Sequence, residues 1–194
     1  MGQLKTWALI LGAAALTVGL SPALAQAPGQ LVAAEAAPAA EAAPALETAS
    51  YADLFSIAFP AGWQVSEQTE APQLVADSVG ASGSLPAMRT EVTWQEAPPR
   101  EVVGESLESL RANGYVVTRY DAVTIDGVTA VRLWINGIPE ALPNAFITYV
   151  GYPTATATIT SYYGDTTDNI DPVLNAIHRS FARSQATSTA PQDN

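Results

Sequence analysis

Residues 55–65, FSIAFPAGWQV, constrain the fold of this chain more than any other stretch. Large apolar residues fill every second position of its first half, namely Phe55, Ile57 and Phe59. This period-two pattern predicts a β-strand with one strongly apolar face. The segment 60–62, PAG, then predicts a turn, and Trp63 opens a second short strand. We therefore expect a folded domain to begin near Tyr51 and to bury these side chains in its core.

Hydrophobic periodicity and turn residues predict further strands and two helices downstream of this corner. The predicted strands are 73–79, 89–95, 115–125, 128–135, 146–152 and 155–163, and the predicted helices follow Pro98-Pro99 and span residues 170–181. Asp126-Gly127 is typical of a type I′ hairpin turn. Because successive hairpins build an antiparallel sheet that both helices can cover, we predict an α+β fold, an antiparallel β-sheet sandwiched between helices.

Each predicted helix carries one apolar stripe that would face the sheet. The stripe of the first helix is Val103, Leu107 and Leu110. The stripe of the last helix is Ile170, Val173, Leu174, Ile177 and Phe181. Asp168 or Asp171 is predicted to cap the start of the last helix, because acidic side chains are favoured there.

The two ends of the chain predict segments outside this domain. Residues 1–25 read as a secretory signal, with Lys5, an apolar run shorter than the roughly 20 residues of a membrane span, and a small-x-small cleavage site. An uncleaved membrane anchor is the alternative. Residues 26–50 are rich in Ala, Pro and Glu and predict a flexible tether. The domain is then 51–183, and 184–194 is predicted to be a disordered tail.

The composition restricts the partners. The formal net charge is −11, and Lys5 is the only lysine. A chain this acidic can release few counterions from DNA or RNA, so nucleic acid is not an expected partner. An anionic membrane surface would repel it as well. The chain has no cysteine, which excludes disulfides, thiolate catalysis, cysteine zinc sites and lipid attachment through cysteine. Basic protein partners and cations remain allowed by this charge.

Four segments resemble the PsbP-like family, whose founding member is an extrinsic subunit of the photosystem II oxygen-evolving complex. They are FSIAFPAGWQV at 55–65, VTIDGVTAVRLWI at 123–135, ATATITSYYG at 155–164 and VLNAIHRSF at 173–181. The resemblance implies an antiparallel sheet between helical layers and a non-enzymatic role in binding or assembly on the lumenal or periplasmic side. Plant members retain calcium and chloride at the oxygen-evolving site, whereas a wider set of bacterial exported proteins shares the fold without photosynthesis.

Two groups of polar residues are candidates for chemistry. Asp165, Asp168 and Asp171 recur every three residues and could offer oxygen ligands to calcium, or could serve only to cap the last helix. His178 is the only histidine and lies at the edge of the apolar stripe of that helix. We predict a packing role for His178 rather than general-base catalysis, because no nucleophile motif accompanies it.

The aromatic residues of the strands offer either a core or a ligand pocket. The tryptophans concerned are Trp63, Trp94 and Trp134, and we predict that they belong to the core. Together these patterns predict an exported, non-enzymatic PsbP-like interaction or assembly protein of the periplasm or thylakoid lumen. Its partner would be a membrane complex, photosystem II among them, and no cofactor is required. The alternative is a soluble periplasmic module that binds a small molecule or calcium.

Overall fold

The computed structural model describes residues 45–68, 73–78, 85–166 and 169–184. The predicted signal, the predicted tether up to residue 44, Asp168 and the predicted tail from residue 185 lie outside the described residues. No helix in the described part is long and apolar enough to cross a membrane.

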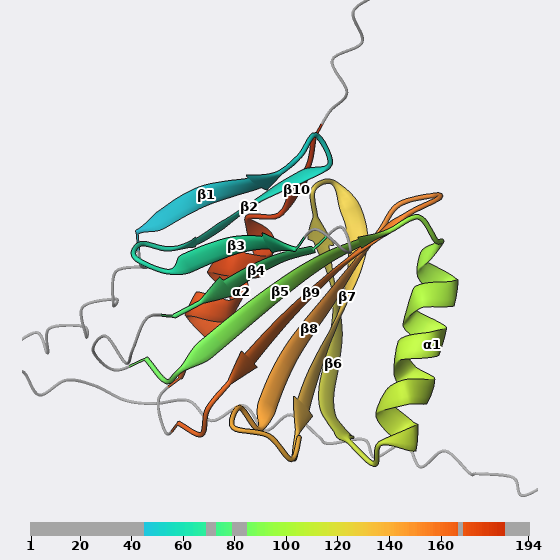
Figure 1. The fold of residues 1–194 in the computed structure, drawn as a ribbon. Coiled ribbons are helices and arrows are strands. Elements are labelled where there is room, and N and C mark those ends of the chain that lie inside the picture. Colours follow the sequence, from blue (N-terminus) through green and yellow to red (C-terminus); the bar gives the residue numbers. More distant parts are fainter. Residues whose placement is uncertain (1–44, 69–72, 79–84, 167–168, 185–194) are drawn as a thin grey trace, which may run out of the picture. The chain divides into compact units, whose positions relative to one another are not determined.

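A seven-stranded antiparallel sheet forms the centre of the fold, in the order β3-β4-β5-β9-β8-β7-β6 (Figure 1). Its strands are β3 (Gln64–Gln68), β4 (Gln73–Asp77), β5 (Met88–Gln95), β6 (Val116–Ile125), β7 (Val128–Asn136), β8 (Asn144–Gly151) and β9 (Thr156–Tyr163). Each of these strands was predicted from hydrophobic pattern or turn residues, with ends that differ by a few residues. The turn between β6 and β7 has positive φ at Asp126 and Gly127, as a type I′ hairpin requires.

A second, three-stranded sheet contains the stretch that opens the predicted domain. It has the order β1-β2-β10, with strands β1 (Leu46–Tyr51), β2 (Phe55–Pro60) and β10 (Ala182–Arg183). Residues 46–50 were predicted to be tether, yet they pair with β2 from Leu46↔Pro60 to Tyr51↔Phe55. The pairing explains the difference, because an edge strand gains its order from backbone hydrogen bonds and needs little side-chain burial.

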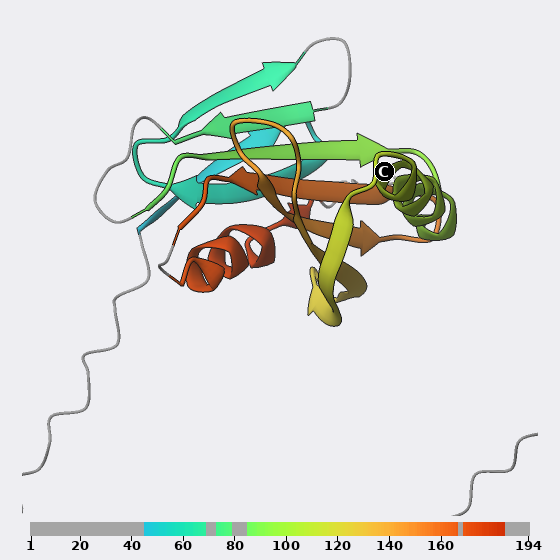
Figure 2. The ribbon, with the colours of Figure 1, turned by 90° about the horizontal axis from the view of Figure 1, so that it is seen from below.

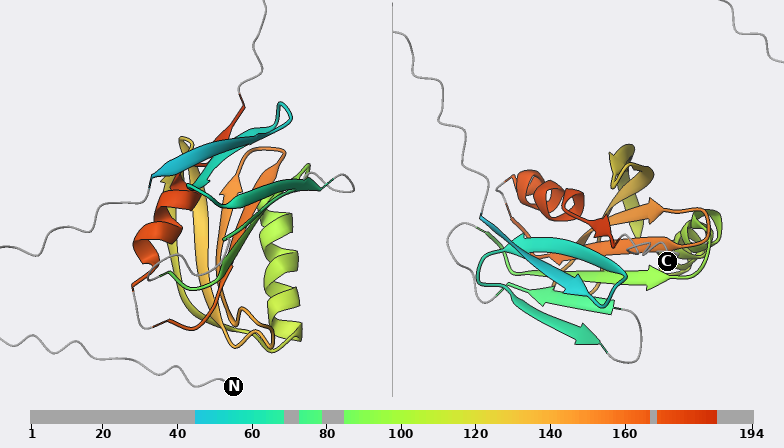
Figure 3. Two further views of the ribbon diagram at one scale, coloured as in Figure 1. Left: turned by 60° about the vertical axis from the view of Figure 1, so that its left-hand side comes forward. Right: turned by 90° about the horizontal axis from the view of Figure 1, so that it is seen from above.

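The two faces of the large sheet are covered by different elements (Figure 3). One face packs against β2 and α2 (Asp171–Arg179), and their shared core includes Phe55, Ile57, Phe59 and Ile177, all fully buried or nearly so. The other face packs against α1 (Pro99–Ala112), mainly over β7 and β8. Seen from below, α2 lies beside the sheet at the left, and α1 is viewed nearly down its axis at the right-hand end of the sheet (Figure 2). The fold is therefore the predicted α+β class, an antiparallel sheet between helical layers.

The helix α1 packs two of its three predicted stripe residues, Val103 and Leu110, against the core, where both are partly buried. Val102 is its buried apolar residue, and the Ser106 hydroxyl bonds that of Tyr149 on β8. Leu107, which was predicted to face the core, is 40% exposed. A helical stripe is about 100° wide, and the stripe that α1 turns to the sheet includes Val102 and Ser106 and has Leu107 at its flank.

Candidate functional site

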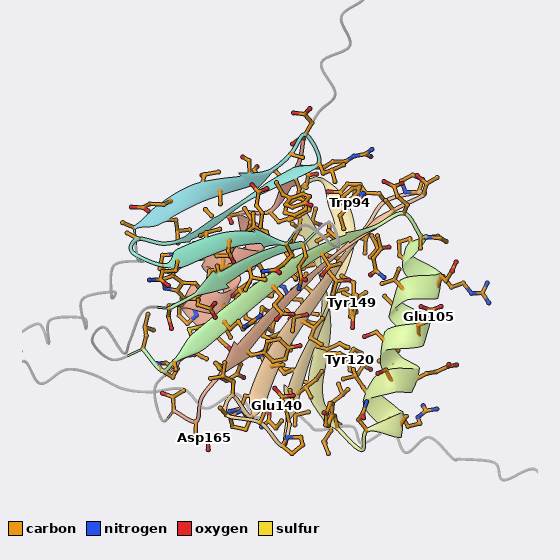
Figure 4. All side chains as sticks on the ribbon, in the orientation of Figure 1. Trp94, Glu105, Tyr120, Glu140, Tyr149 and Asp165 are labelled. Atoms are coloured by element: carbon orange, nitrogen blue, oxygen red, sulfur yellow. The ribbon has the colours of Figure 1, made fainter. Side chains whose placement is uncertain are left out.

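A polar cleft lies where the ends of four elements meet, near Asp165 (Figure 4). Its volume is about 370 Å³, and its lining residues are Asn136, Asn144, Tyr163, Asp165, Thr166, Asn169, Ile170 and Asp171. They come from the end of β7, the start of β8, the end of β9 and the start of α2. The cleft is shaped by the sheet register, which places Asn136, Asn144 and Tyr163 in one row across three strands.

The cleft contains two of the three predicted acidic site residues. Asp165 accepts a hydrogen bond from Asn144 Nδ2 at 3.1 Å. Asp171 accepts from Trp134 Nε1 at 3.4 Å and lies 3.5 Å from Arg119 Nη1. In the described part of the chain no three acidic or histidine side chains are grouped to hold a metal ion. The arginine already offsets the charge of Asp171, so the cleft offers hydrogen bonds more than a concentrated negative charge.

The prediction that Asp171 caps the start of α2 is wrong for its side chain. Asp171 is the first residue of α2, and the helix has no side-chain cap at Ile170. Asn169 Oδ1 accepts the backbone N–H of Asp171 at 3.2 Å instead. Asn169 therefore satisfies one of the free N–H groups of the first turn, and the Asp171 carboxylate is left to bond β6 and β7.

A second cleft, of about 440 Å³, lies at the other end of the large sheet. It is lined by Asp53, Leu54, Trp94, Glu96, Asp126, Arg183 and Ser184. The Arg183 guanidinium stacks 5.5 Å from the centre of the Trp94 ring and 5.4 Å from that of Tyr152. These contacts are within the range of cation–π attraction, so the cleft has an aromatic floor on which a cation already lies.

Hydrogen bonds fix the aromatic floor of this second cleft. The Tyr152 hydroxyl donates to Asp126 Oδ2 at 2.6 Å, and Trp94 Nε1 donates to Glu96 at 2.9 Å. Burial raises the pKa of Tyr152, and the hydrogen bond and charge of Asp126 raise it further. Tyr152 therefore stays protonated at neutral pH and acts as a donor, not as a base.

His178 is fully buried, deeper than the predicted stripe edge. Its Nδ1 lies 2.7 Å from Thr148 Oγ1, and its Nε2 lies 2.9 Å from Ser161 Oγ, which is 2.7 Å from Thr90 Oγ1. Burial lowers the pKa of His178 well below its usual value, and the charge of Arg132 lowers it further. The imidazole is thus neutral, with one nitrogen donating and one accepting. It joins α2 to β8 and β9, and solvent does not reach it, so the geometry is that of a structural network.

The edge strand β6 carries the two large apolar side chains with the highest exposed fractions among the described residues. Tyr120 is 78% exposed, Val116 is 59% exposed, and Val117 is also exposed. In the described chain β6 pairs only with β7, so its outer backbone edge faces no strand. The register shifts between Val117 and Arg119, which places a bulge at Thr118. Sequence alternation predicted this strand but gave no sign that it lies at the edge of the sheet.

The tryptophans are distributed as predicted with one difference. Trp94 and Trp134 are buried. Trp63 is only half-buried and stacks on Phe59 with ring centres 6.1 Å apart. Tyr162 and Tyr163 pack on opposite faces of the sheet, as adjacent strand residues must.

Comparison with known proteins gives structural likenesses only. No family model and no curated protein matches the chain. The solution structure of cyanobacterial PsbP (CyanoP) from Synechocystis sp. PCC 6803 aligns with a TM-score of 0.48 and 13% identity, over 76% of this chain and 96% of that one. A protein of unknown function from Pseudomonas aeruginosa, PA94, aligns with a TM-score of 0.40 and 16% identity, over 61% and 83%.

A third solved structure is the STAR-related lipid transfer protein fragment from Xanthomonas axonopodis. It aligns with a TM-score of 0.34 and 12% identity, over 61% of this chain and 92% of that one. With TM-scores under 0.5 and identities of 16% or less, none of these likenesses assigns a function to the chain.

Proposed function

We propose that this chain is an exported, non-enzymatic interaction protein that docks a protein partner along β6. The observation that carries the proposal is the edge position of β6 combined with the exposure of Val116, Val117 and Tyr120. The secretory signal predicted at residues 1–25 and the resemblance to PsbP-like proteins support a place in the periplasm or thylakoid lumen. The partner would be a membrane complex on that side, photosystem II being the case that the resemblance suggests.

An edge strand is a ready-made binding element. Its unpaired N–H and C=O groups can accept an extended segment of another chain, and alternate side chains then give specificity. Tyrosine is enriched among residues that dominate binding energy at interfaces. The register places Tyr120 opposite Leu133 and so on the α1 side of the sheet. The net charge of −11 favours a basic partner segment.

Site-specific photo-cross-linking tests the proposal. A benzophenone side chain at Tyr120 should form one dominant adduct with a membrane complex of the host, and the same group at Glu105 on α1 is the control (Figure 4). Tyr120→Asp in the unlabelled chain should fail to compete for that adduct, whereas Glu105→Gln should still compete. Equal adducts from both positions, or none from Tyr120, would rule out docking at β6.

A small-molecule module is the second candidate, and the cleft around Trp94 favours it. The cleft volume of about 440 Å³ and the aromatic floor suit a ligand with a positively charged group, which would replace the Arg183 guanidinium over the rings. The calcium version of this candidate rests on Asp165 and Asp171, which line the other cleft. A flat calorimetric trace at millimolar calcium would remove the calcium version.

A further inference from the structure

Three arginines gather where α2 faces β6 and β7. They are Arg119 on β6, Arg132 on β7 and Arg179 at the end of α2. Burial lowers the pKa of Arg132, the charge of Asp121 raises it, and the positive charges of Arg179 and Arg119 lower it again, so these charged groups lie close enough to act on one another. In a chain whose net charge is −11, three arginines beside the two carboxylates of Asp121 and Asp171 still leave a local excess of positive charge. Such an excess attracts anions.

Arg132 has one edge of its guanidinium without a partner. The residue is only 2% exposed, and Nη1 donates to Asn175 Oδ1 at 2.7 Å. Nε and Nη2 are buried and donate to no residue of the described chain. These two N–H groups together form the fork that binds both oxygens of a carboxylate or phosphate. A buried charged donor without an acceptor is costly, so this free edge calls for an explanation.

The Asp121 carboxylate is the internal group best placed to accept hydrogen bonds from this edge of Arg132, but it does not do so. Asp121 pairs with Arg132 across the strands, and its Oδ1 is also buried without a partner in the described residues. The other oxygen lies 3.5 Å from Arg119 Nη2. Arg119 is also 3.5 Å from Asp171, and its side chain is 56% exposed. Both distances exceed the roughly 2.8 Å of a strong charge-assisted hydrogen bond. Neither carboxylate therefore closes a short ion pair with Arg119, whose guanidinium stacks 4.0 Å from the centre of the Trp134 ring.

We propose that Arg119, Arg132 and Arg179 form a binding site for an oxyanion, a carboxylate or phosphate group of a small molecule. Arg132 takes the two oxygens on its free edge, and Asn175 holds the guanidinium in place from the other side. The two exposed arginines cover the bound group and neutralise its charge. Asp121 competes for the same edge when no ligand is bound. This site is separate from docking at the outer edge of β6.

Titration of the purified chain with inorganic phosphate, followed by ³¹P NMR and calorimetry at low salt, tests the site. Saturable binding is expected, and acetate should displace phosphate if the natural ligand is a carboxylate, whereas only sulfate should displace it if the site prefers tetrahedral oxyanions. Arg119→Gln and Arg179→Gln should each weaken phosphate binding about tenfold, the effect of losing one charge-assisted contact. Both residues are exposed, so these variants should fold.

Two further variants make the test decisive. Arg111→Gln removes the same charge from the exposed end of α1 and should leave phosphate binding unchanged. Asp121→Asn removes the competing carboxylate and should tighten phosphate binding. If Asp121 instead closes the Arg132 edge in solution, Asp121→Asn will lower stability without tightening phosphate binding, which overturns the proposal. Equal binding by Arg119→Gln, Arg179→Gln and Arg111→Gln, meaning an adventitious ion only, would overturn it as well.

Discussion

His178 should make the stability of this fold fall as the pH drops below neutrality. The imidazole is fully buried, and its pKa is lowered well below 6.5, first by burial and then by Arg132. A group whose pKa is lower in the folded chain binds its proton more readily once the chain unfolds. The stabilising contribution of the neutral histidine is therefore complete above the unfolded pKa of about 6.5 and is lost progressively below it.

The size of this effect follows from proton linkage. Between pH 7 and pH 5 the histidine of the unfolded chain becomes almost fully protonated, while the buried one stays neutral. Each pH unit below the unfolded pKa costs about 1.4 kcal/mol, so the free energy of unfolding should fall by about 2 kcal/mol over this window. Ordinary carboxyl groups titrate near pH 4 and contribute little above pH 5.

Urea unfolding of the wild-type chain and His178→Gln at pH 7, 6 and 5 checks this. The variant should lose about 1–3 kcal/mol at pH 7, because Thr148 or Ser161 then lacks a well-placed partner. It should, however, lose less than about 0.5 kcal/mol on going to pH 5, because no imidazole remains to titrate. Thr148→Val is the control, since it removes a hydrogen bond but keeps the imidazole and so keeps the pH dependence. Parallel pH profiles for wild type and His178→Gln would refute the reasoning.

Three further substitutions test the packing, each by urea unfolding. Gly151→Ala should cost about 1–3 kcal/mol, because the added Cβ would lie 2.5 Å from a proline ring carbon at the start of α1; a neutral effect would mean that α1 moves freely on β8. Phe146→Ala, at a fully buried position, should cost about 3–5 kcal/mol, and a loss under about 1 kcal/mol would contradict its place in the core. Asp126→Ala removes the acceptor of the Tyr152 hydroxyl and of the Arg183 amide, and should also lower the pKa of Tyr152 in an ultraviolet titration; an unchanged tyrosine titration would contradict that contact.

A strand could be predicted most readily where its side chains alternate between two environments, as the burial of β5 does along its length. In the three-stranded sheet, β2 is the clearest case, since Phe55, Ile57 and Phe59 alternate in the sequence and all three are buried in the core. The strand 46–51 could not be predicted in this way, because all six of its residues are half-buried or exposed, without a regular alternation. Its order comes from backbone pairing with β2, which lies later in the chain.

Trp63 shows how a local pattern can overstate burial. The corner before it predicted a core tryptophan, and the ring does stack on Phe59. It nevertheless stays half-buried, because it precedes β3, the edge strand whose five residues are all exposed. A loss of about 3–5 kcal/mol on truncation applies to fully buried aromatic residues, so Trp63→Ala should cost less than Phe146→Ala.

The candidate sites depend on sheet order, which alternation does not encode. Asp165 and Asp171 line one cleft partly because they are close in sequence. Asn136 and Asn144 reach the same cleft only because β7, β8 and β9 are neighbours in register. The hairpin signal at Asp126 likewise predicted that β6 pairs with β7. It could not predict that β6 is an edge strand, with no second neighbour among the described residues.

The polar residues of α2 explain why its position on the sheet is well defined. An apolar stripe alone would allow the helix to slide or rotate, because hydrophobic contact is not directional. His178 bonds Thr148 and Ser161, and Asn175 bonds Arg132, so three strands are each tied to one position of the helix. Any shift of α2 would leave these buried groups unpaired, at a cost of about 1–3 kcal/mol each. The bond from Arg132 to Asn175 also orients the guanidinium so that its other edge stays free. The contact that positions the helix is therefore the one that shapes the proposed oxyanion site.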